Sequence, residues 1–239
     1  MLNEFIDYLH EQIGEPYLWG GQHTLLTRAN YKKVIRQKEK NTGGYPDGES
    51  YADAVIKYCT KKFENPDISV LYGYDCSGLG CYWLYNLMHV ISSDMTAQKM
   101  SSICIIMGSI PKRGYWLFRF NTAGTKISHI GYMVDDKYLI EAKGRRYGVK
   151  RTLYRRAEWD LVGIPKPFIS EIQPLVKVLG NYVNIRDKGN TSGRVIKIAK
   201  KGERYPFIDR DIDGWYEIYV PSIGRIGYIS DREDLTRLE

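Results

Sequence analysis

The sequence predicts an α+β domain followed by a small all-β barrel, and three observations carry this prediction. Apolar residues recur at helical spacing over roughly the first hundred residues. Strand-like segments rich in β-branched and aromatic residues follow between residues 115 and 168. Beyond Pro165 and Pro167, about six short strands alternate with turns. Helices that precede an antiparallel sheet are typical of the α+β class.

We therefore expect two domains, at residues 1–170 and 175–239. A chain of 239 residues with 43% hydrophobic and 26% charged residues is typical of a soluble globular protein with a sizeable core. The sequence contains neither a basic signal-peptide start nor a run of about 18 apolar residues, so we expect no signal peptide and no membrane insertion. The expected protein is made in the cytoplasm and reaches an outside target after lysis, on a virion, or by non-classical export.

The helical part begins with an apolar stripe over residues 2–13, which predicts an amphipathic helix that stops at Gly14. The stretch GEPYLWGG follows, and residues 22–74 look like an insertion. Two helices are expected in it, at 28–40 and 50–64. Ser50 opens the second helix, with Asp53 three residues later as a variant of the capping box.

Cys76 stands where a turn-forming stretch gives way to an apolar helical pattern. The pattern consists of Leu79, Trp83, Leu87 and Met88. Cys76 is therefore expected at a helix N-terminus, where unpaired N–H groups and the helix dipole favour a thiolate. Such positions lower a cysteine pKa from about 8.5 to roughly 3.5–7.5, which makes the sulfur a nucleophile near neutral pH. The alternative is a small buried hydrophobic residue.

The remaining cysteines indicate free thiols. Cys59, Cys81 and Cys104 are irregularly placed, and no C-x-x-C pair offers a zinc site, so neither a metal nor another cofactor is expected. The net charge of +7 fits attraction to an anionic partner such as a cell wall or nucleic acid. The stretch KKVIRQKEKN has no aromatic residues for stacking on bases and is interpreted as a solvated helix face, so nucleic acid is not an expected partner.

A base for Cys76 must come from four histidines. After the cysteine helix we expect a short helix near 94–101 and then strands. The strand segments are YWLFRF, HIGYMV, YLIEA and LVGIPKPF. His10 and His89 fall in helical patterns, and His23 cannot be placed. His129 begins a strand, where an imidazole can be held rigidly toward a neighbouring helix end.

A catalytic histidine also needs a partner that fixes its tautomer. If the hairpin turn is centred on Asp135, antiparallel pairing places Glu141 directly opposite His129, on the same face of the sheet. A one-residue shift of the turn would break this pairing. The alternative for Glu141 is an exposed strand carboxylate.

Four stretches in order, GEPYLWGG, YDCSGL, HIGYMV and YLIEAKGRRYGV, resemble the NlpC/P60 family of cysteine peptidases. The resemblance implies a papain-like domain in which Cys76 is the nucleophile, His129 the base and Glu141 the orienting group, where the family more often has histidine, asparagine or glutamine. It further implies that Tyr17 shapes the oxyanion site. The implied substrate-binding residues are Trp19, Asp75 and Ser77. No metal or cofactor is implied.

The C-terminal segment resembles a bacterial SH3 (SH3b) domain through YVNIRDKGNTSGRVI, KKGERYPFI, DGWYEIYV and GRIGYIS. Such domains usually bind cell walls, whereas the alternative is a stabilising appendage. The two resemblances together imply a peptidoglycan endopeptidase, a phage or prophage lysin, that cleaves stem peptides, commonly between D-γ-glutamate and the diamino acid. The alternatives are an amidase that cuts between the sugar and L-alanine, an acyltransferase, and a non-catalytic wall-binding protein.

Overall fold

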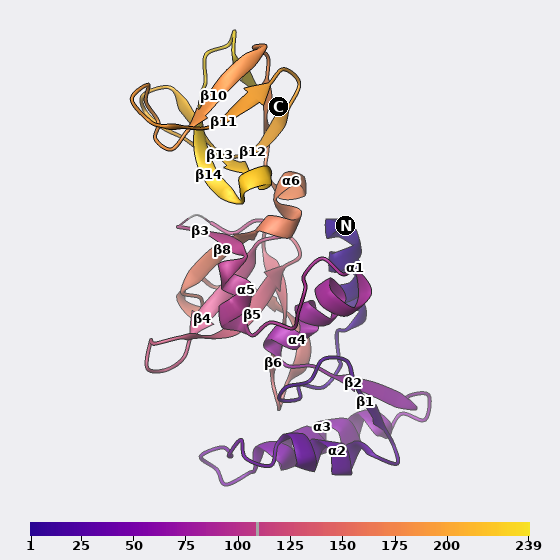
Figure 1. Ribbon diagram of the computed structural model, residues 1–239. Coiled ribbons are helices and arrows are strands. Elements are labelled where there is room, and N and C mark those ends of the chain that lie inside the picture. The colour runs from indigo at the N-terminus through magenta and orange to yellow at the C-terminus, as the bar shows by residue number, and fades with distance from the viewer. Residues whose placement is uncertain (109) are drawn as a thin grey trace. The chain divides into compact units, whose positions relative to one another are not determined.

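The computed structural model describes residues 1–108 and 110–239. The chain divides into two compact units, Met1–Pro167 and Phe168–Glu239. The first unit combines helices with antiparallel sheets, and the second consists mostly of strands (Figure 1). The α+β organisation expected for the first unit is confirmed. Within the described residues, no helix is both long and apolar enough to cross a membrane.

A six-stranded antiparallel sheet forms the centre of the first unit, in the order β3-β8-β4-β5-β6-β7. Its strands are β3 (Cys104–Met107), β4 (Trp116–Phe120), β5 (Ile127–Met133), β6 (Tyr138–Gly144), β7 (Gly148–Leu153) and β8 (Leu161–Pro165). Strands β3 and β7 were not expected from the sequence. Strand β3 has only four residues and pairs with the distant β8, so local sequence carries little signal for it. The short 3-10 helix η2 (Arg156–Glu158) precedes β8.

Helices pack against this sheet through aromatic side chains. The helical segments are α1 (Leu2–Glu11), α4 (Cys76–Cys81), the π-helical η1 (Tyr82–Leu87) and α5 (Ala97–Ser102). The ring of Phe5 in α1 lies 5.2 Å from Trp83, 6.4 Å from Trp116 and 5.6 Å from Tyr132, measured between ring centroids. These contacts explain why the apolar stripe of the first helix is buried. Ile13 lies beyond the helix end and is exposed.

The cysteine helix departs from the expected periodicity in its second half. The turns of η1 are wider than those of an α-helix, so later residues rotate away from the apolar face. Leu87 and Met88 are consequently exposed rather than buried. The expectation that both belong to the buried stripe of this helix is wrong.

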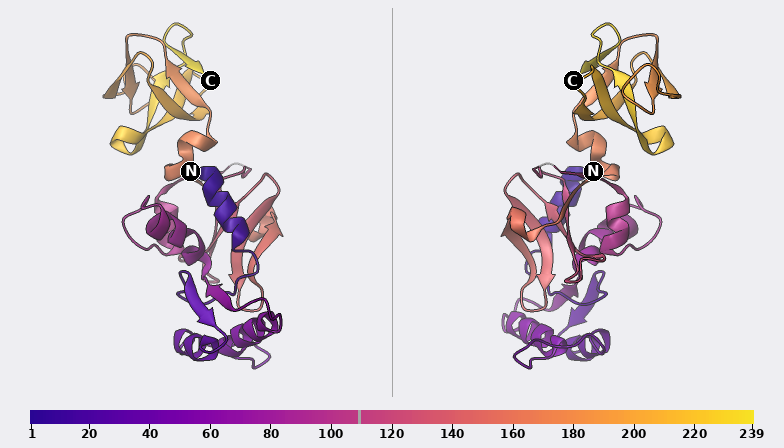
Figure 2. Two further views of the ribbon diagram at one scale, coloured as in Figure 1. Left: turned by 90° about the vertical axis from the view of Figure 1, so that its right-hand side faces the viewer. Right: turned by 90° about the vertical axis from the view of Figure 1, so that its left-hand side faces the viewer.

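The insertion is more structured than expected. Its two predicted helices are confirmed with slightly shorter limits, as α2 (Tyr31–Lys38) and α3 (Tyr51–Phe63). Two unexpected four-residue strands, β1 (Thr24–Thr27) and β2 (Val70–Gly73), pair antiparallel at its base. All four elements lie together beyond the end of the central sheet (Figure 2). The hydroxyl oxygen of Ser50 accepts a hydrogen bond from the backbone N–H of Asp53 at 3.1 Å, which confirms the predicted cap.

The second unit is a seven-stranded sheet in the order β11-β10-β14-β13-β12-β9-β15. The 3-10 helix η3 (Lys166–Phe168) spans the boundary with the first unit. The elements of the second unit are α6 (Ile169–Ile172), β9 (Leu175–Val178), β10 (Tyr182–Arg186), β11 (Val195–Lys200), β12 (Arg204–Arg210), β13 (Trp215–Val220), η4 (Pro221–Ile223), β14 (Arg225–Ser230) and β15 (Thr236–Leu238). The end strands β11 and β15 do not pair within the described residues, so the expected barrel is not closed. The sheet nevertheless encloses an apolar core that includes Val176, Ile185, Ile218 and Ile229.

Candidate active site

Cys76 is the first residue of α4, as the sequence predicts. Asp75 is the N-cap of this helix, and its carboxylate oxygen Oδ1 accepts a hydrogen bond from the backbone N–H of Gly78 at 2.6 Å. The hydroxyl of Ser77 donates to the same oxygen at 3.2 Å. Asp75 therefore satisfies one unpaired N–H group of the first turn and fixes the direction of the helix.

Two glycines let this helix approach its neighbours closely. A side chain at Gly78 would collide with the carbonyl oxygen of Gly21, at the end of the GEPYLWGG stretch. A Cβ atom at Gly80 would lie 2.6 Å from the ring of Tyr132 on β5. The hydroxyl of Tyr132 donates a hydrogen bond to the carbonyl oxygen of Cys76 at 3.1 Å. The backbone of Cys76 is thus anchored directly on the strand that carries His129.

The thiol of Cys76 is enclosed by the backbone of β5 on both sides of His129. Its Sγ donates to the carbonyl oxygen of Ser128 at 3.6 Å, and only 8% of the residue is exposed. Burial and the neighbouring Asp75 carboxylate raise the pKa of Cys76 to about 12, although nearby N–H groups, first that of Ile130, act to lower it. Burial thus opposes the thiolate expected from the helix N-terminus and favours the thiol form of Cys76.

The imidazole of His129 is bound to Glu141 inside the sheet. His129 Nε2 lies 2.7 Å from Glu141 Oε2, and Glu141 is only 3% exposed. The other oxygen, Oε1, accepts a hydrogen bond from the hydroxyl of Thr152 at 2.8 Å and lies 3.6 Å from the ammonium of Lys143. Burial by itself raises the pKa of Glu141, but the His129 and Thr152 hydrogen bonds and the Lys143 charge outweigh it and lower the pKa. Glu141 is therefore a buried carboxylate.

The register that led to this pair differs from the expected one. Tyr132 pairs with Ile140 and Met133 with Leu139, so the turn is centred one residue later than Asp135. Extending this register places Lys143, not Glu141, opposite His129. Glu141 lies two residues away on the same face, at the diagonal position that long side chains can bridge. The expectation that Glu141 lies directly opposite His129 is wrong. The two side chains still meet, because the shifted register leaves both on the same face of the sheet.

Aromatic packing fixes the ring of His129 from one side. Trp159 stacks on it with ring centroids 5.6 Å apart and an interplanar angle of 22°. The guanidinium of Arg119 in turn lies 5.5 Å from the Trp159 ring centroid. Trp159 follows η2, so nothing in the local sequence pattern connects it to His129. Trp159 and Thr152 are site residues that the sequence interpretation missed.

A cavity of about 470 Å³ opens beside Cys76. Its lining includes the predicted residues Tyr17, Trp19, Asp75, Cys76 and Ser77. Burial, followed by Cys76 and Asp75, raises the pKa of Tyr17, so its hydroxyl stays protonated and can donate a hydrogen bond. Trp19 is exposed at the rim. Five of the seven predicted site residues therefore line this cavity, together with Ser128, which is the neighbour of His129 on β5. His129 and Glu141 form a pair of their own behind this strand segment.

The other histidines lie outside this arrangement. His23 is stacked between the rings of Tyr72 and Tyr82, at centroid distances of 3.8 and 4.3 Å, and its Nδ1 lies 2.5 Å from the hydroxyl of Tyr74. Burial lowers its pKa. His10 and His89 are exposed. Among the described residues, no group of three or more His, Cys, Asp or Glu side chains could hold a metal ion.

Comparison with known proteins gives similar solved structures. No family model and no curated protein matches the chain. The NlpC/p60 domain of the peptidoglycan hydrolase SagA is 18% identical, with 68% of this chain and 97% of that chain covered and a TM-score of 0.40. The P60 domain of an antigen from M. avium subspecies paratuberculosis is 17% identical, with 69% and 96% covered and a TM-score of 0.40. Ly7917 is 18% identical, with 100% and 97% covered and a TM-score of 0.30.

The state of the Cys76 thiol can be tested by alkylation. Because the raised pKa keeps the sulfur protonated, its rate of reaction with iodoacetamide should be slow at neutral pH and rise about tenfold per pH unit between pH 7 and pH 9. Peptide mapping by mass spectrometry would follow this residue, with Cys76→Ser as the control. A rate that stays level from pH 6 to pH 9 would instead indicate a preformed thiolate.

Glu141→Ala should reduce turnover by about tenfold or more, because the imidazole loses the group that orients it. Glu141→Gln keeps an acceptor and should be partly active, and Glu11→Ala, at an exposed glutamate of α1, is the control. Since Glu141 is buried rather than a surface residue, Glu141→Ala should also lower the free energy of unfolding by about 1–3 kcal/mol. Wild-type turnover in Glu141→Ala would remove it from the catalytic set.

The same residue predicts a pH dependence of stability. A lowered pKa means that the carboxylate contributes stability above its unfolded pKa of about 4.3 and loses it as the pH falls through the folded value. The difference in unfolding free energy between wild type and Glu141→Gln should therefore shrink below about pH 4. Urea denaturation at several pH values measures it.

Proposed function

We propose that the first unit is a cysteine peptidase that cleaves amide bonds in the stem peptides of peptidoglycan. The observation that carries this proposal is the buried His129–Glu141 pair, in which His129 lies on β5, the strand whose backbone contacts the Cys76 thiol, and Glu141 lies on the neighbouring β6. A nucleophile, a base and a group that orients the base are the minimum set for acyl transfer. The cavity beside Cys76 provides room for the acyl group.

In the proposed reaction, substrate binding brings an amide carbonyl to the thiol. Because Nε2 of His129 is engaged by Glu141, Nδ1 is the nitrogen that takes the proton from Sγ as Sγ bonds to the carbonyl carbon. The imidazolium then returns this proton to the leaving amine as the C–N bond breaks, which leaves a thioester on Cys76. Water attacks the thioester with His129 again as base, releases the carboxylic acid and restores the thiol.

Two groups of the cavity wall can donate hydrogen bonds to the oxyanion. The backbone N–H of Cys76 belongs to the first turn of α4, where it is not used in the helix ladder. The protonated hydroxyl of Tyr17 faces the same cavity. Donors that are fixed before the reaction stabilise the charge that develops on the carbonyl oxygen.

The cavity carries both signs of charge, which supports a stem peptide as substrate. Asp94 and Lys126 line it together with Trp19. A stem peptide offers carboxylates and the free amine of a diamino acid, so each sign has a counterpart. We infer that the bond between D-γ-glutamate and the diamino acid is the one cleaved, as the sequence resemblance implies. An amidase or acyltransferase would use the same residues and differ in its products.

We propose that the second unit binds the cell wall in the manner of an SH3b domain. A shallow groove of about 270 Å³ on this unit is lined by Tyr182, Arg186, Trp215 and Arg232 among others. Tyr182 is 74% exposed. Aromatic faces and guanidinium groups suit a ligand made of sugars, peptides and acidic groups. The role of a released phage or prophage lysin remains a prediction from the sequence.

Cys76→Ser should abolish the hydrolysis of purified peptidoglycan while the melting temperature stays near that of wild type, because one small polar group replaces another. Cys59→Ser, Cys81→Ser and Cys104→Ser are the matched controls and should keep most activity. Mass spectrometry of the released muropeptides identifies the new ends and separates an endopeptidase from an amidase or a transferase. Full activity in Cys76→Ser would rule out the mechanism.

Tyr182→Ala should weaken binding of the full chain to purified walls by about tenfold, as expected for an exposed aromatic residue at a binding centre. The measurement is co-sedimentation in the Cys76→Ser background, so that the wall is not degraded. Tyr147→Ala, at an exposed tyrosine of the first unit, is the control. Salt should weaken binding only in part, because screening acts on the charged contacts alone. Unchanged sedimentation of Tyr182→Ala would argue against this groove.

A further inference from the structure

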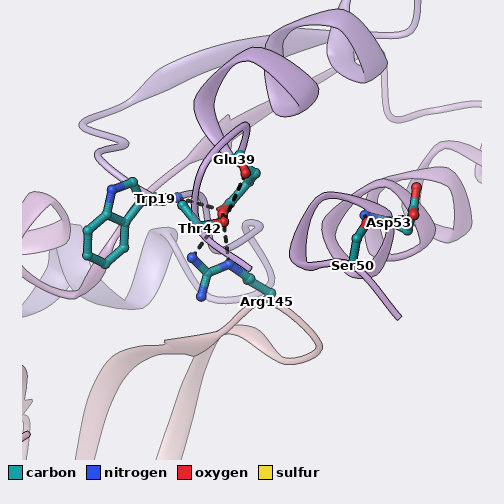
Figure 3. Close-up of polar contacts among 6 residues, drawn as sticks. All are labelled: Trp19, Glu39, Thr42, Ser50, Asp53 and Arg145. Carbon is teal, nitrogen blue, oxygen red and sulfur yellow. Dashed lines mark hydrogen bonds and ion pairs between the residues drawn. The ribbon is translucent and has the colours of Figure 1, made fainter. Parts of the chain in front are cut away.

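Glu39 is a fully buried carboxylate at the end of α2, inside a stretch of lysines that the sequence predicts to be solvated. Its side chain has no exposed surface. Oε1 accepts a hydrogen bond from the backbone N–H of Trp19 at 3.0 Å, and Oε2 accepts one from the hydroxyl of Thr42 at 2.6 Å (Figure 3). The insertion therefore contacts the GEPYLWGG segment directly, through this hydrogen bond to Trp19 at the rim of the candidate active site.

Arg145 completes this contact from the turn between β6 and β7. Its Nε and Nη2 donate to Glu39 Oε2 at 2.9 and 2.8 Å (Figure 3). The guanidinium carbon lies 5.2 Å from the ring centroid of Tyr17, 5.8 Å from that of Trp19 and 4.1 Å from that of Tyr51. Arg145 thus contacts the two aromatic residues of the cavity wall and one aromatic residue of α3 in the insertion.

Leu18 provides a second attachment between the same two parts. Its side chain is fully buried in the apolar core of the insertion, with Leu26, Ile35 and Val55 among its members. Its backbone N–H donates to the carbonyl oxygen of Tyr74 at 2.8 Å. Tyr17 and Trp19, the residues before and after Leu18, both line the cavity. The packing of Leu18 in the insertion core therefore helps to fix their positions.

The hairpin that carries Arg145 also carries the partner of the base. Strand β6 contains Glu141 and runs directly into the turn in which Arg145 lies. One ion pair therefore joins three parts of the site: the insertion, the Tyr17–Trp19 segment and the β6–β7 hairpin. A misplacement of about 1 Å in a catalytic group can lower the rate by about 100-fold. An ion pair that fixes the positions of these three parts can therefore affect turnover without touching substrate.

We propose that Glu39 and Arg145 are positioning residues, through which the insertion serves as a fixed wall of the active-site cavity. The kinetic test of this proposal rests on the proposed function. The claim that Glu39 and Arg145 fix the positions of Tyr17 and Trp19 does not depend on it. Replacing a buried ion pair by uncharged side chains is often neutral for stability, whereas removing one partner leaves an unpaired buried charge. This difference allows positioning and stability to be separated.

The experiment compares Arg145→Met, Glu39→Gln and the double variant in the full chain. Arg145→Met should lower kcat by about 100-fold with a smaller change in KM, and Glu39→Gln should lower kcat by about tenfold. The double variant should recover the melting temperature lost in Arg145→Met, because no unpaired charge remains, but should keep the low kcat.

Arg146→Gln is the matched control from the same turn. Arg146 donates to Glu49 at 2.8 Å and to Asp47 at 2.5 Å in the exposed loop of the insertion. It makes no such contact with Tyr17 or Trp19 within the described residues. An exposed pair contributes little, so kcat should stay within about twofold of wild type. A double variant with wild-type melting temperature and wild-type kcat would overturn the proposal.

Two readouts need no substrate and separate this proposal from the proposed function. Loosening of Tyr17 should make Cys76 alkylation at pH 8.5 severalfold faster in Arg145→Met and in the double variant, but not in Arg146→Gln. Quenching of tryptophan fluorescence by acrylamide should rise in the same variants as Trp19 is released. If wild type cleaves no peptidoglycan, the proposed function fails and these readouts still decide. Unchanged alkylation and quenching in the double variant would contradict the positioning role.

Discussion

The close contact between α4 and β5 is the constraint on which the rest of the candidate site depends. Gly80 allows the helix to lie against the ring of Tyr132, and the Tyr132 hydroxyl holds the carbonyl of Cys76. This contact places the thiol against the backbone of the strand that supplies His129. Without it, Cys76 and His129, which are distant in the sequence, would have no fixed positions relative to each other.

Burial raises the pKa of both acids of the site, yet their net pKa shifts run in opposite directions. The thiol of Cys76 is buried with few charged partners of opposite sign, so burial dominates and raises its pKa. The carboxylate of Glu141 is buried as well, but His129, Thr152 and Lys143 surround it, and its pKa falls. The negative charge is therefore favoured on Glu141 and disfavoured on the sulfur. In the mechanism proposed above, this difference favours proton transfer from Cys76 to His129 after substrate binds over an ion pair formed beforehand.

The insertion shows how a buried charge can connect distant segments. Glu39 and Arg145 are far apart in the sequence of the first unit. Glu39 accepts hydrogen bonds from Arg145 and from the backbone N–H of Trp19, and Arg145 also packs on the ring of Tyr51. Such an arrangement is more directional than apolar packing, because hydrogen bonds fix angles as well as distances. Leu18 adds the apolar part of the same attachment.

The sequence by itself determined the elements whose signals are local. These include the cysteine helix with Cys76 at its first position, the Ser50 cap, the two helices of the insertion and most strands of the first sheet. Tertiary structure decided everything that depends on distant partners. The diagonal meeting of His129 and Glu141, the raised pKa of Cys76, the burial of Glu39 and the open sheet of the second unit belong to this group. The physical reason is that periodicity and capping act within one or two turns of chain, whereas burial, register and pKa are set by neighbours that only the folded chain brings together.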